Sequence, residues 1–156
     1  MAYDHSLYTE ARLKVGTSPA QVKTALKPLT DYLFSFDKFS FNRETGDLVF
    51  STSGDVCDNF HDLVVEAAAN LGPLTQSPSL LTLSNHTTAD LENAVDVVFY
   101  GASVEAVEQF HFEVDFADAM AKLSEHLPAE AIGKLKEVAT AVFTAKRANV
   151  AQGVAA

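Results

Sequence analysis

Apolar and polar side chains alternate in three short stretches within the first third of the chain. From Leu7 to Val15 every second residue is apolar or a threonine, and polar residues fill the positions between them. The same period of two occurs in Phe39–Phe41 and in Leu48–Thr52, on either side of a turn-forming run that contains Gly46. A period of two is typical of a strand with one buried face. The pattern therefore predicts a first strand followed later by a hairpin.

Apolar residues at helical spacing predict two helices around this hairpin. Ser18 offers an N-cap with a proline directly after it, and apolar residues then recur every three or four positions from Val22 to Leu33. Pro28 should kink this helix, because proline donates no backbone hydrogen bond. A second apolar stripe runs through Phe60–Leu71 and is ended by a glycine and a proline.

The second half of the chain predicts further strands and two helices. Short apolar stretches at 79–83 and 95–100 are typical of strands. In 108–116, EQFHFEVDF, phenylalanine and valine alternate with polar residues without a break, so we expect a strand there as well. A short helix at 117–127 and a longer amphipathic helix opened by Pro128 complete the pattern.

The order strand, helix, strand, strand, helix, strand over residues 6–84 resembles the split βαβ arrangement of ferredoxin-like folds. We therefore expect a single α+β domain over 1–150, with a ferredoxin-like core and an extension over 85–150. That extension should hold a C-terminal β-hairpin followed by helices. The last residues, 151–156, carry little bulk and should fray. Element order alone implies no activity, because this fold hosts many functions.

Composition bounds the class of protein. The chain has 156 residues, 47% of them hydrophobic, which is enough for a substantial core. Cys57 is its single cysteine, so neither an intrachain disulfide nor a cysteine-rich metal site can form. The first residues have neither a basic nor an apolar leader, and no stretch is long and apolar enough to span a membrane. We expect a cytoplasmic protein without a cofactor.

Charge is distributed very unevenly. The net charge is -10, and there is no lysine or arginine between Arg43 and Lys122. Such an interval repels nucleic acid and anionic membranes, and it attracts a basic protein surface. The carboxylates that we expect to bind this partner are Asp90, Glu92, Asp96, Glu105, Glu108, Glu113, Asp115 and Asp118.

A metal or acid-base site is the alternative. On the expected strand at 108–116, His111 and Glu113 would lie on one face about 6.6–6.8 Å apart, with Asp115 next in the row. Both could reach one cation if a further ligand, His61, His86 or His126, converged on them. No spacing in the sequence shows that convergence, and a solvated strand face explains the same residues.

Two functions follow from these patterns. The first is a non-enzymatic binding or regulatory protein that engages a basic protein surface, as a mimic of nucleic acid or as an inhibitor. The second is a small-molecule or metal-binding domain, with or without enzymatic activity, centred on His111 and Glu113. Either one is compatible with a homodimer, because an uncovered sheet face or edge is often closed by a second copy.

Overall fold

The computed structural model describes residues 3–33, 36–56, 59–86 and 95–151. The chain divides into two compact units, which we call unit 1 (Met1–His111) and unit 2 (Phe112–Ala156). Unit 1 combines a sheet with helices, and unit 2 is helical within its described residues. The α+β class expected from the sequence is confirmed.

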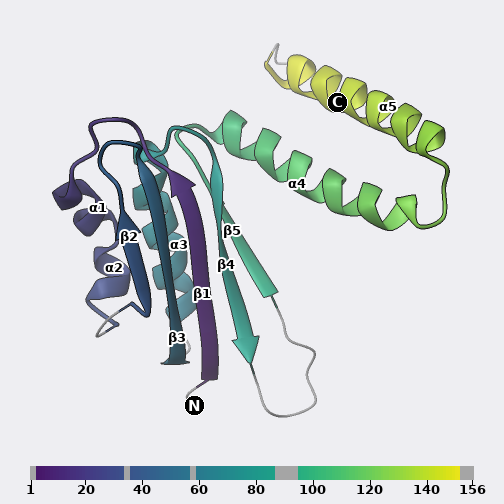
Figure 1. Cartoon of the computed structure of the whole chain (residues 1–156). Helices are drawn as coiled ribbons and strands as arrows, with labels where there is room; N and C mark the ends of the chain where they lie inside the picture. The colour runs from purple at the N-terminus through teal and green to yellow at the C-terminus, as the bar shows by residue number, and fades with distance from the viewer. Residues whose placement is uncertain (1–2, 34–35, 57–58, 87–94, 152–156) are drawn as a thin grey trace. The chain divides into compact units, whose positions relative to one another are not determined.

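Unit 1 is built on a five-stranded antiparallel sheet (Figure 1). Its strands are β1 (Tyr3–Arg12), β2 (Lys38–Phe41), β3 (Asp47–Val56), β4 (Ser79–His86) and β5 (Val95–Tyr100). Their order is β2-β3-β1-β4-β5, and each neighbouring pair is antiparallel. The first strand of the sequence is therefore the central strand of the sheet, and β2 and β5 form its two edges.

Three helices cover one face of this sheet (Figure 1). They are α1 (Pro19–Ala25), α2 (Lys27–Thr30) and α3 (Phe60–Leu71), the last continuing into a 3-10 turn, Gly72–Leu74. The first expected helix breaks at Leu26, just before the proline that was expected to kink it. The largest fully buried side chains lie between sheet and helices and are Leu7, Leu13, Val22, Leu26, Leu29, Leu48, Phe50, Val64, Leu71 and Leu81.

A buried polar contact joins the central strand to the β4–β5 edge. The Thr9 hydroxyl donates to the backbone carbonyl of Leu80 over 2.7 Å. Its oxygen also lies 2.8 Å from the Tyr100 hydroxyl. Because Thr9 has a single proton and a carbonyl can only accept, Tyr100 must be the donor in the second bond. The Ser79 hydroxyl adds a bond to the Glu10 carbonyl over 2.6 Å, so β1, β4 and β5 are held in one register.

Unit 2 consists of two helices within its described residues. Helix α4 (Val104–Ser124) starts in unit 1 and continues into unit 2, and α5 (Ala129–Ala151) follows after a short connection. Their contact is aromatic: the rings of Phe112 and Phe143 stack with centroids 4.0 Å apart. Phe112 also stacks on Phe116 at 5.5 Å.

The strand expected at 108–116 is wrong, because these residues lie inside α4. An alternating pattern also contains pairs four residues apart, such as Phe112 and Phe116, and this is helical spacing too. The Ser103 side chain accepts a hydrogen bond from the Ala106 amide at 3.2 Å and so caps the helix start. The expected C-terminal hairpin is therefore wrong as well, and β5 pairs with β4 instead.

The buried Tyr100 makes stability depend on pH in the alkaline range. Burial raises the pKa of its phenol, and the hydrogen bonds with Thr9 and Ser79 offset part of this effect. The unfolded chain then loses the phenol proton first, so the free energy of unfolding falls as the pH rises above about 10 and towards the raised folded pKa. We expect Tyr100→Phe to cost about 1 kcal/mol at neutral pH but to flatten this decline. Urea titrations across pH test it, and equal alkaline slopes for the two proteins would contradict it.

Candidate functional site

An apolar pocket lies in unit 1, between helices α1 and α2 and the edge strand β2. We call it the Phe pocket. It has a volume of about 330 Å³. Its lining consists of Pro19, Val22, Lys23, Leu26, Thr30, Phe36, Phe39 and Phe41. Pockets of this size, lined mainly by apolar and aromatic side chains, are typical of ligand sites.

The helical wall of the Phe pocket is fixed by the start of α1. The Ser18 side chain accepts from the Gln21 amide at 3.2 Å, and the Gln21 side chain accepts from the Ser18 amide at 2.8 Å. This reciprocal capping box satisfies two amides that the first helical turn leaves without partners. Pro19 occupies the first turn, where its ring is compatible with a helix. The cap therefore sets the direction in which α1 presents Val22 and Lys23.

The opposite wall is aromatic. Phe36 packs against the buried Phe50 with ring centroids 5.1 Å apart. It also stacks on Phe39 at 5.8 Å. Phe39 belongs to β2 and remains 50% exposed, although strand pairing places it opposite Phe50 on the helix-covered face. A large ring with one anchored side and one open side provides a surface on which another apolar group can pack.

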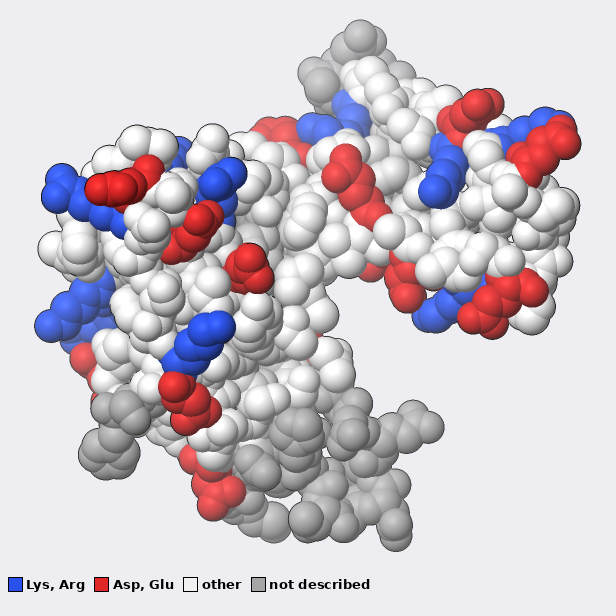
Figure 2. All heavy atoms as spheres, in the orientation of Figure 1, with Lys and Arg blue, Asp and Glu red and all other residues white. Residues whose placement is uncertain are grey.

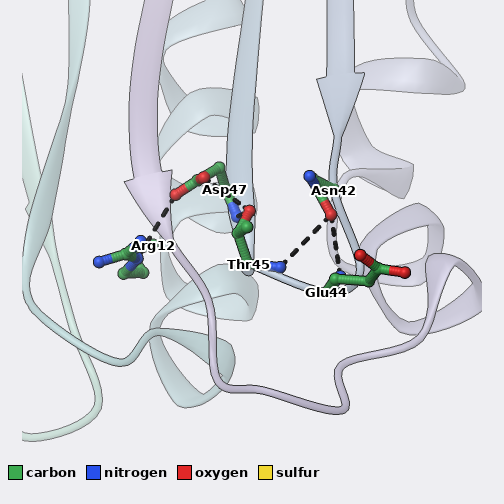
Figure 3. A network of polar contacts seen from close by, with 5 residues as sticks. All are labelled: Arg12, Asn42, Glu44, Thr45 and Asp47. Atoms are coloured by element: carbon green, nitrogen blue, oxygen red, sulfur yellow. Dashed lines mark hydrogen bonds and ion pairs between the residues drawn. The ribbon is translucent and has the colours of Figure 1, made fainter.

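The β2–β3 turn holds this edge strand in place (Figure 3). The Asn42 side-chain oxygen accepts from the amides of Glu44 at 2.9 Å and Thr45 at 3.3 Å. The Thr45 hydroxyl donates to Asp47 over 2.6 Å, and Asp47 lies 3.4 Å from the Arg12 guanidinium on β1. The turn is thereby tied to the central strand, which fixes where β2 presents its phenylalanines.

Lys23 is the one charged residue among the described residues that line the pocket. The other polar lining residue, Thr30, donates its hydroxyl to the Lys27 carbonyl at 3.3 Å. Lys27 itself pairs with Asp31, the residue that directly follows α2. The lining thus offers apolar contact and one cation. This arrangement suits an apolar group that carries a negative charge nearby.

The edge of the sheet next to the pocket offers backbone groups as well. Within the described residues, β2 pairs with β3 alone. An edge strand of this kind presents amides and carbonyls that can pair with another extended chain. The strand has four residues and begins with Lys38. A short edge strand that carries a lysine limits unspecific pairing with other chains.

The structure does not assemble the site expected at His111 and Glu113. On α4 these residues are two positions apart and point to different sides of the helix, because neighbours on a helix lie three or four positions apart. The His111 ring instead stacks on Phe99 with centroids 4.1 Å apart. His61 and His126 are exposed on other segments. Across the described residues no group of three or more histidine, cysteine or carboxylate side chains could hold a metal ion.

The carboxylates expected to bind a basic partner are distributed over both units. Asp96 is exposed on β5, and Glu105 and Glu108 are exposed on the first turns of α4. Those in unit 2, also exposed on α4, are Glu113, Asp115 and Asp118. Asp90 and Glu92 lie outside the described residues. Figure 2 shows basic side chains among the acidic ones on the face in view.

One of these carboxylates has a cation beside it. Asp118 accepts a hydrogen bond from Lys122 at 2.7 Å, one helical turn later. This bond and the charge of Asp118 raise the pKa of Lys122. Both side chains are largely exposed, and exposed pairs of this kind contribute little to stability. The pair therefore reduces the negative charge that α4 presents at this turn. A basic partner that binds Asp118 would have to displace Lys122.

No protein-family model, curated protein or solved structure matches the chain. Among the helices that the structure describes, none has a segment long and apolar enough to cross a membrane. Sequence reasoning missed the Phe pocket, although the run FSFDKFSF at 34–41 was a signal: its aromatic density exceeds what one short edge strand can bury.

Gly46 is expected to be essential to the turn that positions β2. Its φ is +80°, and a Cβ placed there would lie 2.2 Å from the carbonyl oxygen of Leu13. We expect Gly46→Ala to lower the free energy of unfolding by roughly 2–4 kcal/mol, from strain and displaced backbone. Gly133→Ala is the control, because a Cβ on that helical glycine meets nothing within 4 Å. Chemical denaturation compares the two, and a loss of stability no larger for Gly46→Ala than for Gly133→Ala would refute the expectation.

Proposed function

We propose that the protein is a non-enzymatic binding protein whose unit 1 holds an extended peptide segment of a partner protein. The segment pairs with the edge of β2 and inserts one large apolar side chain into the Phe pocket. A carboxylate next to that side chain faces Lys23. The observation that carries the proposal is that an apolar pocket lies beside a strand edge with which no other strand of the described residues pairs.

The geometry of a strand explains why the two features act together. Side chains of an extended chain alternate between the two faces of a sheet. A segment that pairs with β2 would therefore direct every second side chain to the helix-covered face, where Phe39 and Phe41 line the pocket. Backbone pairing then provides affinity that does not depend on sequence, and the pocket provides specificity.

The strand order also supports a more specific fold for unit 1. We propose that β1 to β4 with α1 to α3 form a ferredoxin-like split βαβ core, extended at one edge by β5. The order β2-β3-β1-β4 with all neighbours antiparallel supports this proposal, and so does the placement of all three helices on one face. In that arrangement β2 stays at the edge, and the partner segment continues the sheet.

A labelled pentapeptide, Asp-Val-Phe-Val-Asp, provides a direct probe of the pocket. We expect it to bind the wild type in fluorescence anisotropy, and Phe39→Ala to raise Kd by about tenfold or more through the loss of the stacking ring. Lys23→Gln should raise Kd by a few-fold and remove most of the dependence on salt. Both residues lie at the rim of the pocket rather than in the buried core, so the variants should fold.

The matched control is Tyr8→Ala. Tyr8 is an aromatic residue of similar exposure, 45%, but it pairs with Ser51 and Thr82 on the other face of the sheet. The control should bind the pentapeptide with the affinity of the wild type. Equal weakening by Phe39→Ala and Tyr8→Ala, or no binding by the wild type, would overturn the proposed site.

A second candidate function is supported by α4. This helix carries five carboxylates and one lysine, all exposed. We propose that these carboxylates, with Asp96 and with Asp90 and Glu92 of the preceding segment, engage a basic protein surface. An excess of one sign of charge on a helix accelerates association with a partner of opposite charge and makes binding strongly dependent on salt. The single cysteine and the acidic surface are both consistent with the cytoplasm as the proposed location.

Two variants of equal net charge distinguish whether binding depends on the position of the carboxylates or only on the total charge of the protein. The first neutralises Glu108, Glu113 and Asp115 on α4, and the second neutralises Glu44, Asp62 and Glu66, which are exposed elsewhere in unit 1. With a decalysine peptide as probe, we expect the α4 variant to lose about tenfold in affinity and the other to stay near the wild type. Equal losses measured by calorimetry at low salt would show that only total charge matters, and would dismiss α4 as a site.

A further inference from the structure

Helix α5 carries an apolar stripe that is largely exposed. Leu135, Val138 and Val142 are 41%, 61% and 62% exposed. Their spacing of three and then four residues places them along one side of the helix. Single exposed apolar residues are ordinary on protein surfaces, but a row of three on one helix side marks a surface that packs against something.

The stripe is not the surface that joins α5 to α4. That contact is made by Phe143, which stacks on Phe112 at 4.0 Å. Phe143 follows Val142 directly and so lies about 100° further around the helix. Helix α5 therefore has two apolar sides, and the intramolecular contact uses one of them.

Unit 2 has little buried apolar surface among its described residues. Among its described residues, Met120 of α4 is buried, and no α5 residue whose exposure is described is buried. Most helical stability in proteins comes from packing of an apolar side rather than from helix propensity. A hairpin of two helices with this little burial stays marginal unless its second apolar side is covered.

The charged residues beside the stripe indicate which kind of surface can pack on it. Helix α5 has four basic and two acidic residues, and Lys134 and Lys146 lie next to the stripe. Lys134 bonds to Glu130 at 2.7 Å, an exposed pair one turn apart that contributes little. Helix α4 has the opposite balance, with five carboxylates and one lysine. The surface that matches the stripe and its lysines is thus an acidic helix, and every copy of this chain carries one.

Helical spacing puts both features on one side of the hairpin. On α4, Asp115 and Asp118 are three residues apart and lie roughly 100° around the helix from the Phe112–Phe116 contact. The stripe lies roughly 100° around α5 from Phe143, in the same rotational sense. Because the two helices run antiparallel (Figure 1), equal rotations point to the same side.

From this geometry we propose that two copies of the chain associate through this side of unit 2 into a four-helix arrangement. The α5 stripe of each copy packs on the partner copy's hairpin, and Lys134 and Lys146 face the partner's α4 carboxylates. The interface is isologous, so each contact occurs twice. It is independent of the Phe pocket, which belongs to unit 1.

The first test is solution mass by sedimentation equilibrium. We expect the wild-type chain to be dimeric at about 100 µM, and the double variant Val138→Asp with Val142→Asp to be monomeric, because charges in a packed apolar seam cost several kcal/mol. Thr140→Asp is the control, since it adds a charge to another side of α5. Far-UV circular dichroism checks that each variant stays helical. A monomeric wild type, or a double variant that remains dimeric, would overturn the proposal.

A charge exchange distinguishes this arrangement from other dimers. One variant carries Lys134→Glu and Lys146→Glu, and the other carries Asp115→Lys and Asp118→Lys. Each alone should dimerise at least about tenfold more weakly than the wild type. Mixed together they should form heterodimers that native mass spectrometry resolves by mass. A mixture without heterodimers would contradict the contact between α5 and the partner copy's α4.

Discussion

The central position of β1 is the constraint on which unit 1 depends. It pairs with β3 along its whole length on one side and with β4 on the other. Its buried Thr9 hydroxyl accepts a hydrogen bond from the Tyr100 hydroxyl and donates one to the Leu80 carbonyl, so a single side chain connects three strands. A buried hydroxyl without a partner costs roughly 1–3 kcal/mol. A slip of one residue would expose the apolar side chains and break both of these bonds, which fixes the register of the sheet.

The pocket and the strand edge proposed for binding lie at β2, away from the central strand β1. Beside β1, Leu7, Ala11 and Thr9 are buried, and the strand pairs with a neighbour on each side. At β2 the helices α1 and α2 cover the sheet incompletely, and Phe39 remains half exposed beside an unpaired edge. The turn held by Asn42 and Asp47 keeps that edge ordered. A rigid scaffold thus presents an incompletely packed margin, as in many proteins where binding residues lie at the periphery.

Sequence patterns predicted the elements whose spacing of apolar residues fits only one type of secondary structure. The alternation from Leu7 onward and the stripe in 60–71 gave β1 and α3, since each is long enough to exclude the other period. The pattern at 108–116 fits both periods, and the cap at Ser103 decides for a helix. The aromatic run at 34–41 was a signal of exposed aromatic surface, but the pocket itself could not be located, because its walls come from α1, α2, the segment before β2 and β2 itself, which meet only after folding. The ferredoxin-like core and the acidic docking function stay predictions.

The two units differ in how much of their apolar surface they bury. Unit 1 buries a continuous core under three helices. The described part of unit 2 has an aromatic contact between two helices and an exposed stripe on α5. In the proposed dimer, the acidic residues of α4 meet the basic residues of the partner copy's α5. The charge pattern that makes the chain acidic as a whole can therefore select a single mode of association.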